Sequence, residues 1–396
     1  MTTTHENEAG SHGRYQDQGW EHWPEDPWFS YQFRRALGEA QEGGGAISEV
    51  FQTGEKIKPH DNESWYSAWL GVAERARDYA QAAKDAGNTQ TARAAWLRAS
   101  NYFRSAEFML GAKDPRRLPT YDQGERSFQS AAALFDPPIE VVAVPFEGKH
   151  LHGYFVRPAY GEAPWPTVIA FGGLDSFKEE VYFMVAKGLA ERGIACFFMD
   201  GPGQGATLRR EQLHARHDYE VPVGAVIDYL EQRGDVDASR IGVSGTSLGG
   251  YYATRVACCE PRIAAAVSHG AEWDIGAEVK AENPESGAAE HFRYILGVDS
   301  WDEVLRLFEP FALAPVIGQM TCPYLIVHGV HDFFGNEQAD LAYEGVRAAG
   351  VDAEIRLVNP EETGADHCQH DNPTLGLEII GDWFAKKLGA PSEVHV

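Results

Sequence analysis

From residue 138 to about residue 390, short apolar segments alternate with longer amphipathic ones. A short apolar run between turn residues is typical of a buried strand, and apolar residues at helical spacing are typical of a helix packed on a sheet. The alternation therefore predicts an α/β fold with a mostly parallel sheet wrapped by helices. We expect strands within 166–173, 194–200, 240–244, 263–270, 322–332 and 353–360, and helices at 178–193, 221–234, 251–259 and 376–389.

Two departures from this alternation are informative. Segment 139–158 holds two apolar stretches joined at Glu147-Gly148-Lys149, which is typical of a hairpin and predicts an antiparallel edge to the sheet. From Ala271 to about Met320 the alternation stops. A segment this long inside a compact domain is expected to have its own structure, so we interpret 271–320 as an inserted helical cap.

The chain before residue 138 has a different hydrophobic pattern. Between Ser64 and Leu110, Trp, Tyr and Phe recur at helical spacing among charged residues, and Gly87-Asn88 separates two such stretches. We therefore predict a tail at 1–19, an all-helical domain at 20–137 and a catalytic domain at 138–390 that carries the cap.

Charge excludes several kinds of partner. The chain has 34 Lys and Arg against 59 Asp and Glu, a formal net charge of −25. Nucleic-acid binding requires clustered cations, so a generic nucleic-acid binder is excluded and docking on an anionic membrane is disfavoured. The sequence contains no run of about 18 apolar residues, so no membrane span is predicted. The polar start and five cysteines without metal-ligand spacing favour a cytoplasmic protein.

The chemistry centres on Ser247. Gly245-Thr246-Ser247-Leu248-Gly249 fits the pattern G-x-S-x-G, follows a predicted strand and precedes a predicted helix. In that context the pattern is typical of the nucleophile turn of α/β-hydrolases, where small neighbours allow a sharp turn that exposes the serine at a helix N-terminus. A structural serine in a Gly-rich turn is the alternative.

A nucleophilic serine needs a base that a carboxylate orients, and in this fold the order along the chain is serine, acid, histidine. Asp332 ends the strand at 322–332 and is the expected acid. His367 lies in the loop after the last strand and is the expected base. The nearby rivals are His370 as a substitute base, Asp366, His328 and His331.

Backbone N–H groups are expected to stabilise the oxyanion. The fold uses the residue after the nucleophile, Leu248, and a second donor in the loop after strand 166–173, which we assign to Gly173 with Leu174 as the alternative. Asp200 to Gly205, DGPGQG, lacks the features of a phosphate loop and is interpreted as a tight turn.

Asp175 follows the oxyanion glycines, so we expect it at the mouth of the site. There its carboxyl group, with a raised pKa, would hydrogen-bond substrate or pass a proton to a carbon leaving group. The alternative is that Asp175 caps the helix that follows.

These motifs carry a family resemblance. GGLDSFKEE, DGPGQG, the Ser247 turn, HGVHD and DHCQH, together with WYSAW and RASNYFRSAEFML in the helical domain, resemble 2,6-dihydroxypseudooxynicotine hydrolase and the fungal hydrolases that shorten polyketide pigment precursors. The likeness runs from about Trp20 to Phe384. It implies cleavage of a carbon–carbon bond next to a ketone, on substrates with an aromatic or heteroaromatic acyl group, without a metal or organic cofactor.

The resemblance also implies site residues. It makes Ser247, Asp332 and His367 a triad, and it matches Asp175 to an acidic residue that is Glu in the nicotine-pathway enzyme, so the fungal members are closer there. Phe333 and Phe334, which follow the acid, are expected to wall an aromatic acyl group, with His370 beside them; a purely structural role for the two rings is the alternative. A homodimer paired through the helical domains is also expected.

The sequence therefore predicts a serine hydrolase that cleaves a carbon–carbon bond beside a ketone in an aromatic or polyketide-like small molecule. A carboxylesterase or thioesterase requires the same triad and stays open as the second hypothesis. A non-catalytic binding protein on this fold is the third.

Overall fold

The structure is a computed structural model that describes residues 20–391. The tail predicted at 1–19 lies outside the described residues. Within the described part of the chain, no helix combines the length and the apolarity that crossing a bilayer requires.

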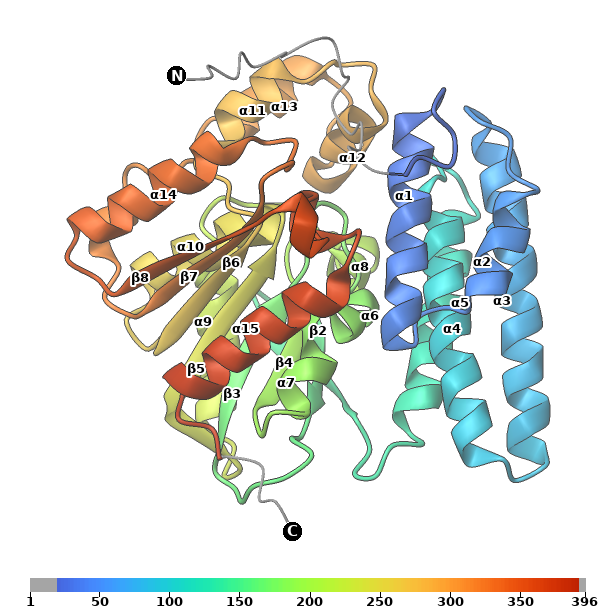
Figure 1. Ribbon diagram of the computed structural model, residues 1–396, viewed down its shortest axis with the longest axis horizontal. Coiled ribbons are helices and arrows are strands. Elements are labelled where there is room, and N and C mark those ends of the chain that lie inside the picture. Colours follow the sequence, from blue (N-terminus) through green and yellow to red (C-terminus); the bar gives the residue numbers. More distant parts are fainter. Residues whose placement is uncertain (1–19, 392–396) are drawn as a thin grey trace.

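Helices precede the first strand, as the hydrophobic pattern of the sequence predicts (Figure 1). They pack around an aromatic core that includes Phe33, Trp65, Trp69, Tyr102 and Phe103. The helices are α1 (Pro27–Gly38), η1 (Glu39–Glu42), α2 (Ile47–Gly54), α3 (Asn62–Asp85), α4 (Thr89–Phe108) and α5 (Arg117–Ala132).

Helix boundaries in this region follow local chemistry. The Asp61 side chain accepts a hydrogen bond from the N–H of Ser64 and so caps α3. Gly87, with φ of +78°, and Asn88 separate α3 from α4, as predicted. The two long helices can therefore lie antiparallel, with the ring of Trp69 on α3 5.7 Å from that of Tyr102 on α4.

The described residues form one eight-stranded sheet in the order β1-β2-β4-β3-β5-β6-β7-β8. The β1 and β2 hairpin is antiparallel and β2 pairs antiparallel with β4, whereas the other neighbours are parallel, so the predicted fold class is confirmed. The strands are β1 (Glu140–Phe146), β2 (Lys149–Val156), β3 (Trp165–Phe171), β4 (Ala195–Asp200), β5 (Val236–Thr246), β6 (Ala265–His269), β7 (Tyr324–Gly329) and β8 (Ala353–Val358).

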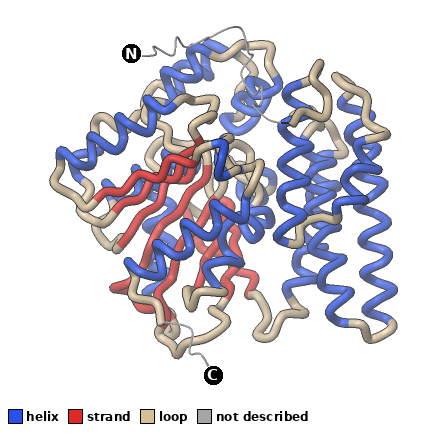
Figure 2. Tube along the Cα trace, viewed as in Figure 1, coloured by secondary structure: helices blue, strands red, loops and turns tan. Residues whose placement is uncertain are grey.

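Helices cover the sheet (Figure 2), and alternate strand residues pack into separate cores on its two faces. Ile169 and Phe171 of β3 join the core that contains α9 and α10, whereas Val168 and Ala170 join the core that contains α15. Both faces are covered, which explains why the strands read as continuous apolar runs. The covering helices are α6 (Lys178–Val181), η2 (Tyr182–Ala186), α7 (Lys187–Ala190), α8 (Gly205–Arg209), α9 (Glu220–Glu231), α10 (Leu248–Cys259), α14 (Asn336–Ala348) and α15 (Pro373–Lys387).

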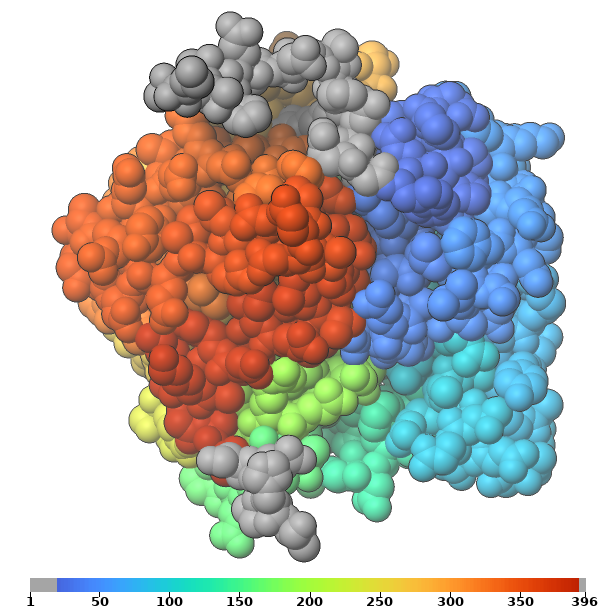
Figure 3. All heavy atoms as spheres, in the orientation of Figure 1, coloured from blue at the N-terminus to red at the C-terminus, as the bar shows by residue number. Residues whose placement is uncertain are grey.

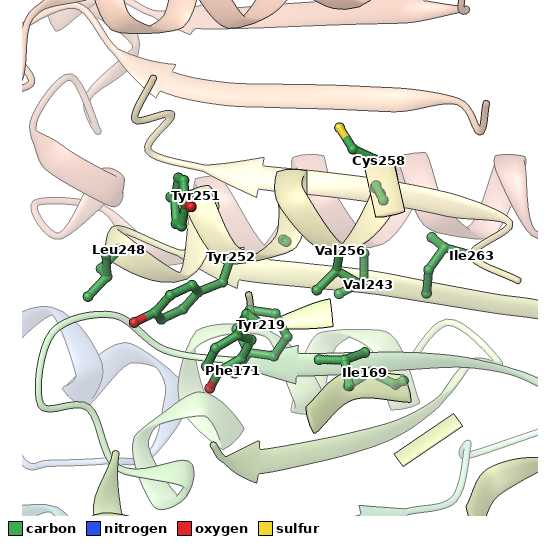
Figure 4. Packing of buried hydrophobic residues seen from close by; sticks show 14 of the residues in the cluster. Ile169, Phe171, Tyr219, Val243, Leu248, Tyr251, Tyr252, Val256, Cys258 and Ile263 are labelled. Atoms are coloured by element: carbon green, nitrogen blue, oxygen red, sulfur yellow. The ribbon is translucent and has the colours of Figure 1, made fainter. Parts of the chain in front are cut away.

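Aromatic packing fixes α10, the helix that follows Ser247. Figure 4 shows Tyr252 of α10 beside Tyr219 and Phe171. The Tyr219 and Tyr252 rings stack with centroids 3.9 Å apart and planes 7° apart, and both are buried. The N-terminus of α10 is therefore held rigidly over the end of the sheet.

The predicted cap consists of three α-helices between β6 and β7, namely α11 (Ile275–Ala281), α12 (Gly287–Leu296) and α13 (Trp301–Phe308), followed by the short helix η3 (Ile317–Gln319). Figure 1 shows the three α-helices over one end of the sheet, beside α1. The helical bundle lies directly against the rest of the molecule, as the space-filling view shows (Figure 3). Ion pairs such as Arg34–Asp366, at 2.7 Å, cross this contact.

Candidate active site

Ser247 occupies a strained turn between β5 and α10. Its backbone has φ of 59° and ψ of −127°, a region that non-glycine residues rarely adopt. The Ser247 N–H donates to the His269 carbonyl at 2.8 Å. A Cβ at Gly245 would lie 1.9 Å from the Gly249 carbonyl oxygen, so only glycine fits there. The turn therefore has the geometry expected of a nucleophile turn.

His367 lies between Ser247 and Asp332. Its Nε2 is 2.8 Å from Ser247 Oγ and its Nδ1 is 2.7 Å from Asp332 Oδ2. Burial opposes ionisation of Asp332, but the neighbouring His367 and His328 hold the pKa of its carboxyl below the ordinary value. The N–H of Phe334 also donates to Asp332 Oδ1, at 3.0 Å. The structure thus brings together the serine, base and acid that the sequence indicates.

The rival residues have other surroundings. Asp366 pairs with Arg34 of the helical bundle. His328 is buried with its Nδ1 3.6 Å from Asp332 Oδ2, beyond the 2.7 Å at which His367 Nδ1 contacts the same oxygen, and His331 is exposed. His370 is buried with its ring 6.3 Å from that of His367, and burial, reinforced by Arg35, holds its pKa well below the ordinary value. Within the described residues the hydrogen-bonded chain therefore uses His367 and Asp332.

The loop after β3 passes very close to Ser247. A Cβ at Gly173 would lie 2.8 Å from Ser247 Cβ and 2.9 Å from the Thr246 carbonyl oxygen, so this approach requires glycine. The Gln204 side-chain amide donates to the carbonyls of Gly172, at 2.6 Å, and Gly173, at 3.0 Å. A trans peptide points its C=O and N–H in opposite directions. The N–H groups of Gly173 and Leu174 therefore both point away from Gln204.

The DGPGQG turn does more than reverse the chain. Gln204 Oε1 accepts from the Gly201 N–H at 3.1 Å and from the Tyr219 hydroxyl at 2.7 Å, which fixes the orientation of its amide. The tight-turn interpretation is incomplete, because the last residues of this motif orient the loop that carries the expected oxyanion donors. Nothing in the sequence pattern around Gln204 indicated this role for its side chain.

The expectation that Asp175 lies at the mouth of the site is wrong. Its carboxylate is buried and binds Arg117, Arg209 and His291, and it does not line the cavity beside Ser247. Burial opposes its ionisation, yet the two guanidiniums and His291 together hold its pKa below the ordinary value, whereas a proton donor would need a raised pKa.

The helix-cap alternative for Asp175 is also wrong. The residue before α6 is Phe177, and the N–H of Lys178 in the first turn is bound by Asp200 Oδ1 at 2.6 Å. Asp175 thus contacts neither substrate space nor the α6 terminus.

A cavity with a volume of about 80 Å³ lies over Ser247 and His367. Its walls come from the helical bundle, from the cap and from the loops at the end of the sheet. The aromatic lining residues are Trp28, Tyr31, Phe108, Phe292, Phe333 and Phe334.

Phe333 and Phe334 lie where the sequence places them, beside the base. Their ring centroids are 4.2 Å and 5.4 Å from that of His367. Tyr31 of α1 reaches the same wall, with its ring 5.9 Å from that of Phe333 and 5.6 Å from that of His370. Trp28, Tyr31 and Phe108 were missed because their approach depends on how the bundle docks.

Glu272 is the acidic residue nearest Ser247 that sequence reasoning missed, and Glu180, Glu278 and Glu282 also line the cavity. Glu272 is buried, lines the cavity and lies 3.5 Å from Ser247 Oγ. It follows β6, whose neighbour β5 leads to Ser247, and the ends of adjacent parallel strands meet at one edge. This position at the end of β6 could have indicated from the sequence that Glu272 lies near Ser247. Within residues 20–391, no group of three or more His, Cys, Asp or Glu side chains is arranged to hold a metal ion.

Comparison with known families agrees with this geometry. Residues 58–279 match the family described as esterase FrsA-like, and residues 176–389 match the prolyl oligopeptidase family. The chain belongs to the FrsA-like α/β-hydrolases. This FrsA-like hydrolase is therefore an enzyme of the α/β-hydrolase type.

Its relatives include fungal hydrolases. It is 39% identical to the hydrolyase poxO of Penicillium oxalicum over 258 residues, which are 62% of this chain and 61% of poxO. The alignment thus spans about three-fifths of that relative. It is 31% identical to the 20-hydroxy-prefusarin hydrolase FUS2 of Gibberella moniliformis, across 93% of this chain and 94% of FUS2.

A solved structure shares the whole architecture. The crystal structure of 2,6-dihydroxy-pseudo-oxynicotine hydrolase superposes with a TM-score of 0.77 at 31% identity, covering 90% of this chain and 97% of that one. The predicted family resemblance is confirmed. The helical bundle and the cap are therefore features that this FrsA-like hydrolase shares with a relative of similar length.

Proposed function

We propose that this enzyme is a serine-dependent hydrolase that cleaves a carbon–carbon bond beside a ketone in an aromatic or polyketide-like small molecule. The observation that carries the proposal is the hydrogen-bonded chain Ser247–His367–Asp332 at the floor of an aromatic cavity, with the Glu272 carboxyl group 3.5 Å from Ser247 Oγ. The relatives named for pseudo-oxynicotine and prefusarin substrates support the substrate class.

The first half of the mechanism forms an acyl-enzyme. His367 accepts the Ser247 proton while Oγ attacks the ketone, and Asp332 stabilises the imidazolium. The N–H groups of Leu248, Gly173 and Leu174 are the donors available for the oxyanion. When the oxyanion collapses, the bond from the carbonyl carbon to the neighbouring carbon breaks, and its electron pair leaves as an enolate or electron-rich arene.

The carbon fragment needs a proton, and two groups can deliver it. One is the His367 imidazolium. The other is Glu272 with its carboxyl group protonated, which takes the part that the sequence analysis gave to Asp175. In that case the His367 imidazolium passes its proton to the Glu272 carboxylate afterwards, so that His367 is neutral again. Water activated by His367 then releases the acyl group as an acid, so one water is consumed for each bond cleaved. In an alternative branch, His367 activates water directly and Ser247 stabilises the adduct.

A carboxylesterase or thioesterase is the second candidate, favoured by the esterase description of the matched family. It needs the same serine, base, acid and oxyanion donors. It does not need a second acid, since the His367 imidazolium can protonate the oxygen or sulfur of the leaving alcohol or thiol directly. Glu272 therefore distinguishes the two candidates.

The test compares wild type, Ser247→Ala and Glu272→Gln on a 4-nitrophenyl ester and on an aryl β-diketone. We expect diketone cleavage to fall by about 10³-fold or more in Ser247→Ala and by about 10²-fold in Glu272→Gln. We expect Glu272→Gln to retain ester hydrolysis. Ester hydrolysis by a wild type that leaves diketones intact would support the esterase instead.

We also propose that the enzyme acts as a cytoplasmic homodimer paired through its helical domains. The support is the family resemblance and the acidic, cysteine-poor composition. Light scattering after size exclusion checks the assembly: a dimer has twice the mass of the chain, and a monomer at micromolar concentration would contradict it.

A further inference from the structure

We propose that Asp175 is a positioning residue through which the helical bundle and the cap hold the oxyanion loop, Gly172–Asp175, in its working conformation. The proposal rests on the proposed nucleophilic role of Ser247. It gives a function to the buried carboxylate that the proposed mechanism leaves unused.

The backbone of Asp175 is in an unusual conformation. Its φ is +47°, in the left-handed region that non-glycine residues rarely adopt. It lies one residue after Leu174 and two after Gly173, whose N–H groups point away from Gln204. Such a conformation persists where the surrounding contacts over-determine it. Contacts that hold Asp175 therefore also fix the peptide planes before it.

Those contacts come from separate parts of the chain. Arg117 at the start of α5 donates to Asp175 Oδ2. His291 of the cap helix α12 lies with Nδ1 3.0 Å from the same oxygen, and Arg209 of α8 pairs with Oδ1 at 2.9 Å. The Asp175 side chain is fully buried. The bundle, the cap and the sheet domain therefore meet on one carboxylate.

A second carboxylate completes the cluster without touching the loop. Glu107 of α4 accepts from Arg117 Nε at 2.7 Å and from Arg209 Nε at 2.9 Å. The ring of Tyr294, also on α12, covers the Arg117 guanidinium at 3.8 Å. Glu107 and Asp175 thus share the same two arginines, but only Asp175 belongs to the oxyanion loop.

The arrangement couples the cap to the chemistry. When α12 is in place, His291 completes the shell around Asp175, and the Gly173 and Leu174 N–H groups keep their direction. Displacing α12 removes that contact and leaves the strained loop less constrained. Closure of the cap over substrate and formation of the oxyanion site are then one event.

The shared arginines provide a matched control. Asp175→Asn and Glu107→Gln each remove one negative charge from the same buried pair of cations. We expect Asp175→Asn to lower kcat on a 4-nitrophenyl ester by about 10²-fold with KM within about threefold, since an oxyanion donor acts in the transition state. We expect Glu107→Gln to lower kcat by less than about threefold, although it lowers the melting temperature comparably.

Labelling of Ser247 by a fluorophosphonate separates the possible failures. We expect the labelling rate to fall in Asp175→Asn and to stay close to wild type in Glu107→Gln. Equal losses in the two variants, tracking their melting temperatures, would overturn the positioning role and leave the proposed function intact. A wild type that is not labelled at Ser247 would overturn both.

A second pair of variants covers the case in which Asp175→Asn does not fold. His291→Leu removes the cap's polar contact with Asp175, whereas His291→Asn keeps a donor of similar reach. We expect kcat to fall by about tenfold in His291→Leu and to be largely restored in His291→Asn, with KM little changed. Identical kcat values in both variants and wild type would refute the coupling.

Discussion

At the scale of single residues, the site depends on how one imidazole is held. His367 contacts Ser247 through Nε2 and Asp332 through Nδ1, and the Asp332 carboxyl has a lowered pKa despite its burial. The anionic acid selects the tautomer in which Nδ1 carries the proton and Nε2 faces the serine. The hydrogen bond between Nδ1 and Asp332 therefore determines that Nε2 is the nitrogen that faces Ser247.

We expect Asp332→Asn to lower kcat by about 10³- to 10⁴-fold, because the amide favours the wrong imidazole tautomer. Steady-state kinetics on a 4-nitrophenyl ester measure this. Asp366→Asn is the matched control, since Asp366 precedes His367 but pairs with Arg34. A comparable loss in Asp366→Asn would contradict the assignment of the acid.

The Gln204 amide gives a second prediction at this scale. Gln204→Glu replaces the two N–H bonds to the Gly172 and Gly173 carbonyls with a carboxylate that repels them. We expect kcat to fall by about 10²-fold with little change in KM, since the loop N–H groups lose their direction. Retention of full kcat would show that Gln204 does not orient the loop.

At the scale of elements, α1 (Pro27–Gly38) contributes one wall of the cavity over Ser247. Trp28 and Tyr31, three residues apart, face the same side of the helix and line the cavity. Asp26 caps α1 by accepting the Phe29 N–H at 3.0 Å, so the helix begins where it can present both rings.

We expect Tyr31→Ala to raise KM for aryl ketones by about tenfold, since a ring that packs against Phe333 and His370 is lost. A small acetate ester should keep its KM. Tyr79→Ala is the control, since Tyr79 is 56% exposed on α3. Loss of affinity for both substrates alike would indicate a folding defect instead.

The strands and the nucleophile turn were predictable because burial on both faces leaves a local signature, apolar runs such as 166–171 bounded by glycine. Short α8 (Gly205–Arg209) and α14 (Asn336–Ala348) were not assigned, although α14 is amphipathic. Asp175 was misplaced for a different reason. Its direction depends on a left-handed backbone and on Arg117 and His291, 58 and 116 residues away in the chain. No local pattern contains that information.

At the scale of the whole molecule, buried charges join the helical bundle to the sheet. Lys178 Nζ lies 2.9 Å from Glu125 of α5, 2.8 Å from its neighbour Glu179 and 3.1 Å from Asp200 at the end of β4. Glu179 also accepts from the Tyr154 hydroxyl at 2.8 Å. The Lys178 ammonium thus pairs with three carboxylates, so the stability of the cluster depends on their protonation.

Glu179 and Glu125 have opposite pKa shifts. Burial raises the pKa of Glu179 from 4.5 to about 7, and Asp200 and Glu125 add to this against the effect of Lys178. Glu125 is buried as well, but Lys178 and Arg210 lower its pKa to about 2. Between pH 4.5 and 7 the folded state therefore holds a proton on Glu179 that the unfolded chain releases, so this contribution to the free energy of unfolding declines as the pH rises.

We expect Glu179→Gln to raise the melting temperature by about 2 °C or more at pH 8 relative to wild type, with a gain that shrinks toward pH 5. Glu125→Gln should lower the melting temperature by a similar amount at every pH from 5 to 8. The pKa of the Glu125 carboxyl lies below this range both in the folded protein, at about 2, and at its ordinary value of 4.5. Calorimetry measures the melting temperatures of both variants. A Glu179→Gln effect that does not vary with pH would contradict the raised pKa.

The central claim is that Ser247 initiates hydrolysis of a carbon–carbon bond. The most direct measurement incubates wild type with an aryl β-diketone in deuterated water enriched in ¹⁸O and analyses both products by mass spectrometry. We expect an aryl acid carrying a solvent ¹⁸O and a ketone fragment carrying a solvent deuteron on its new C–H bond, with neither product formed by Ser247→Ala. An intact diketone, from an enzyme that hydrolyses a 4-nitrophenyl ester through Ser247, would contradict the central claim.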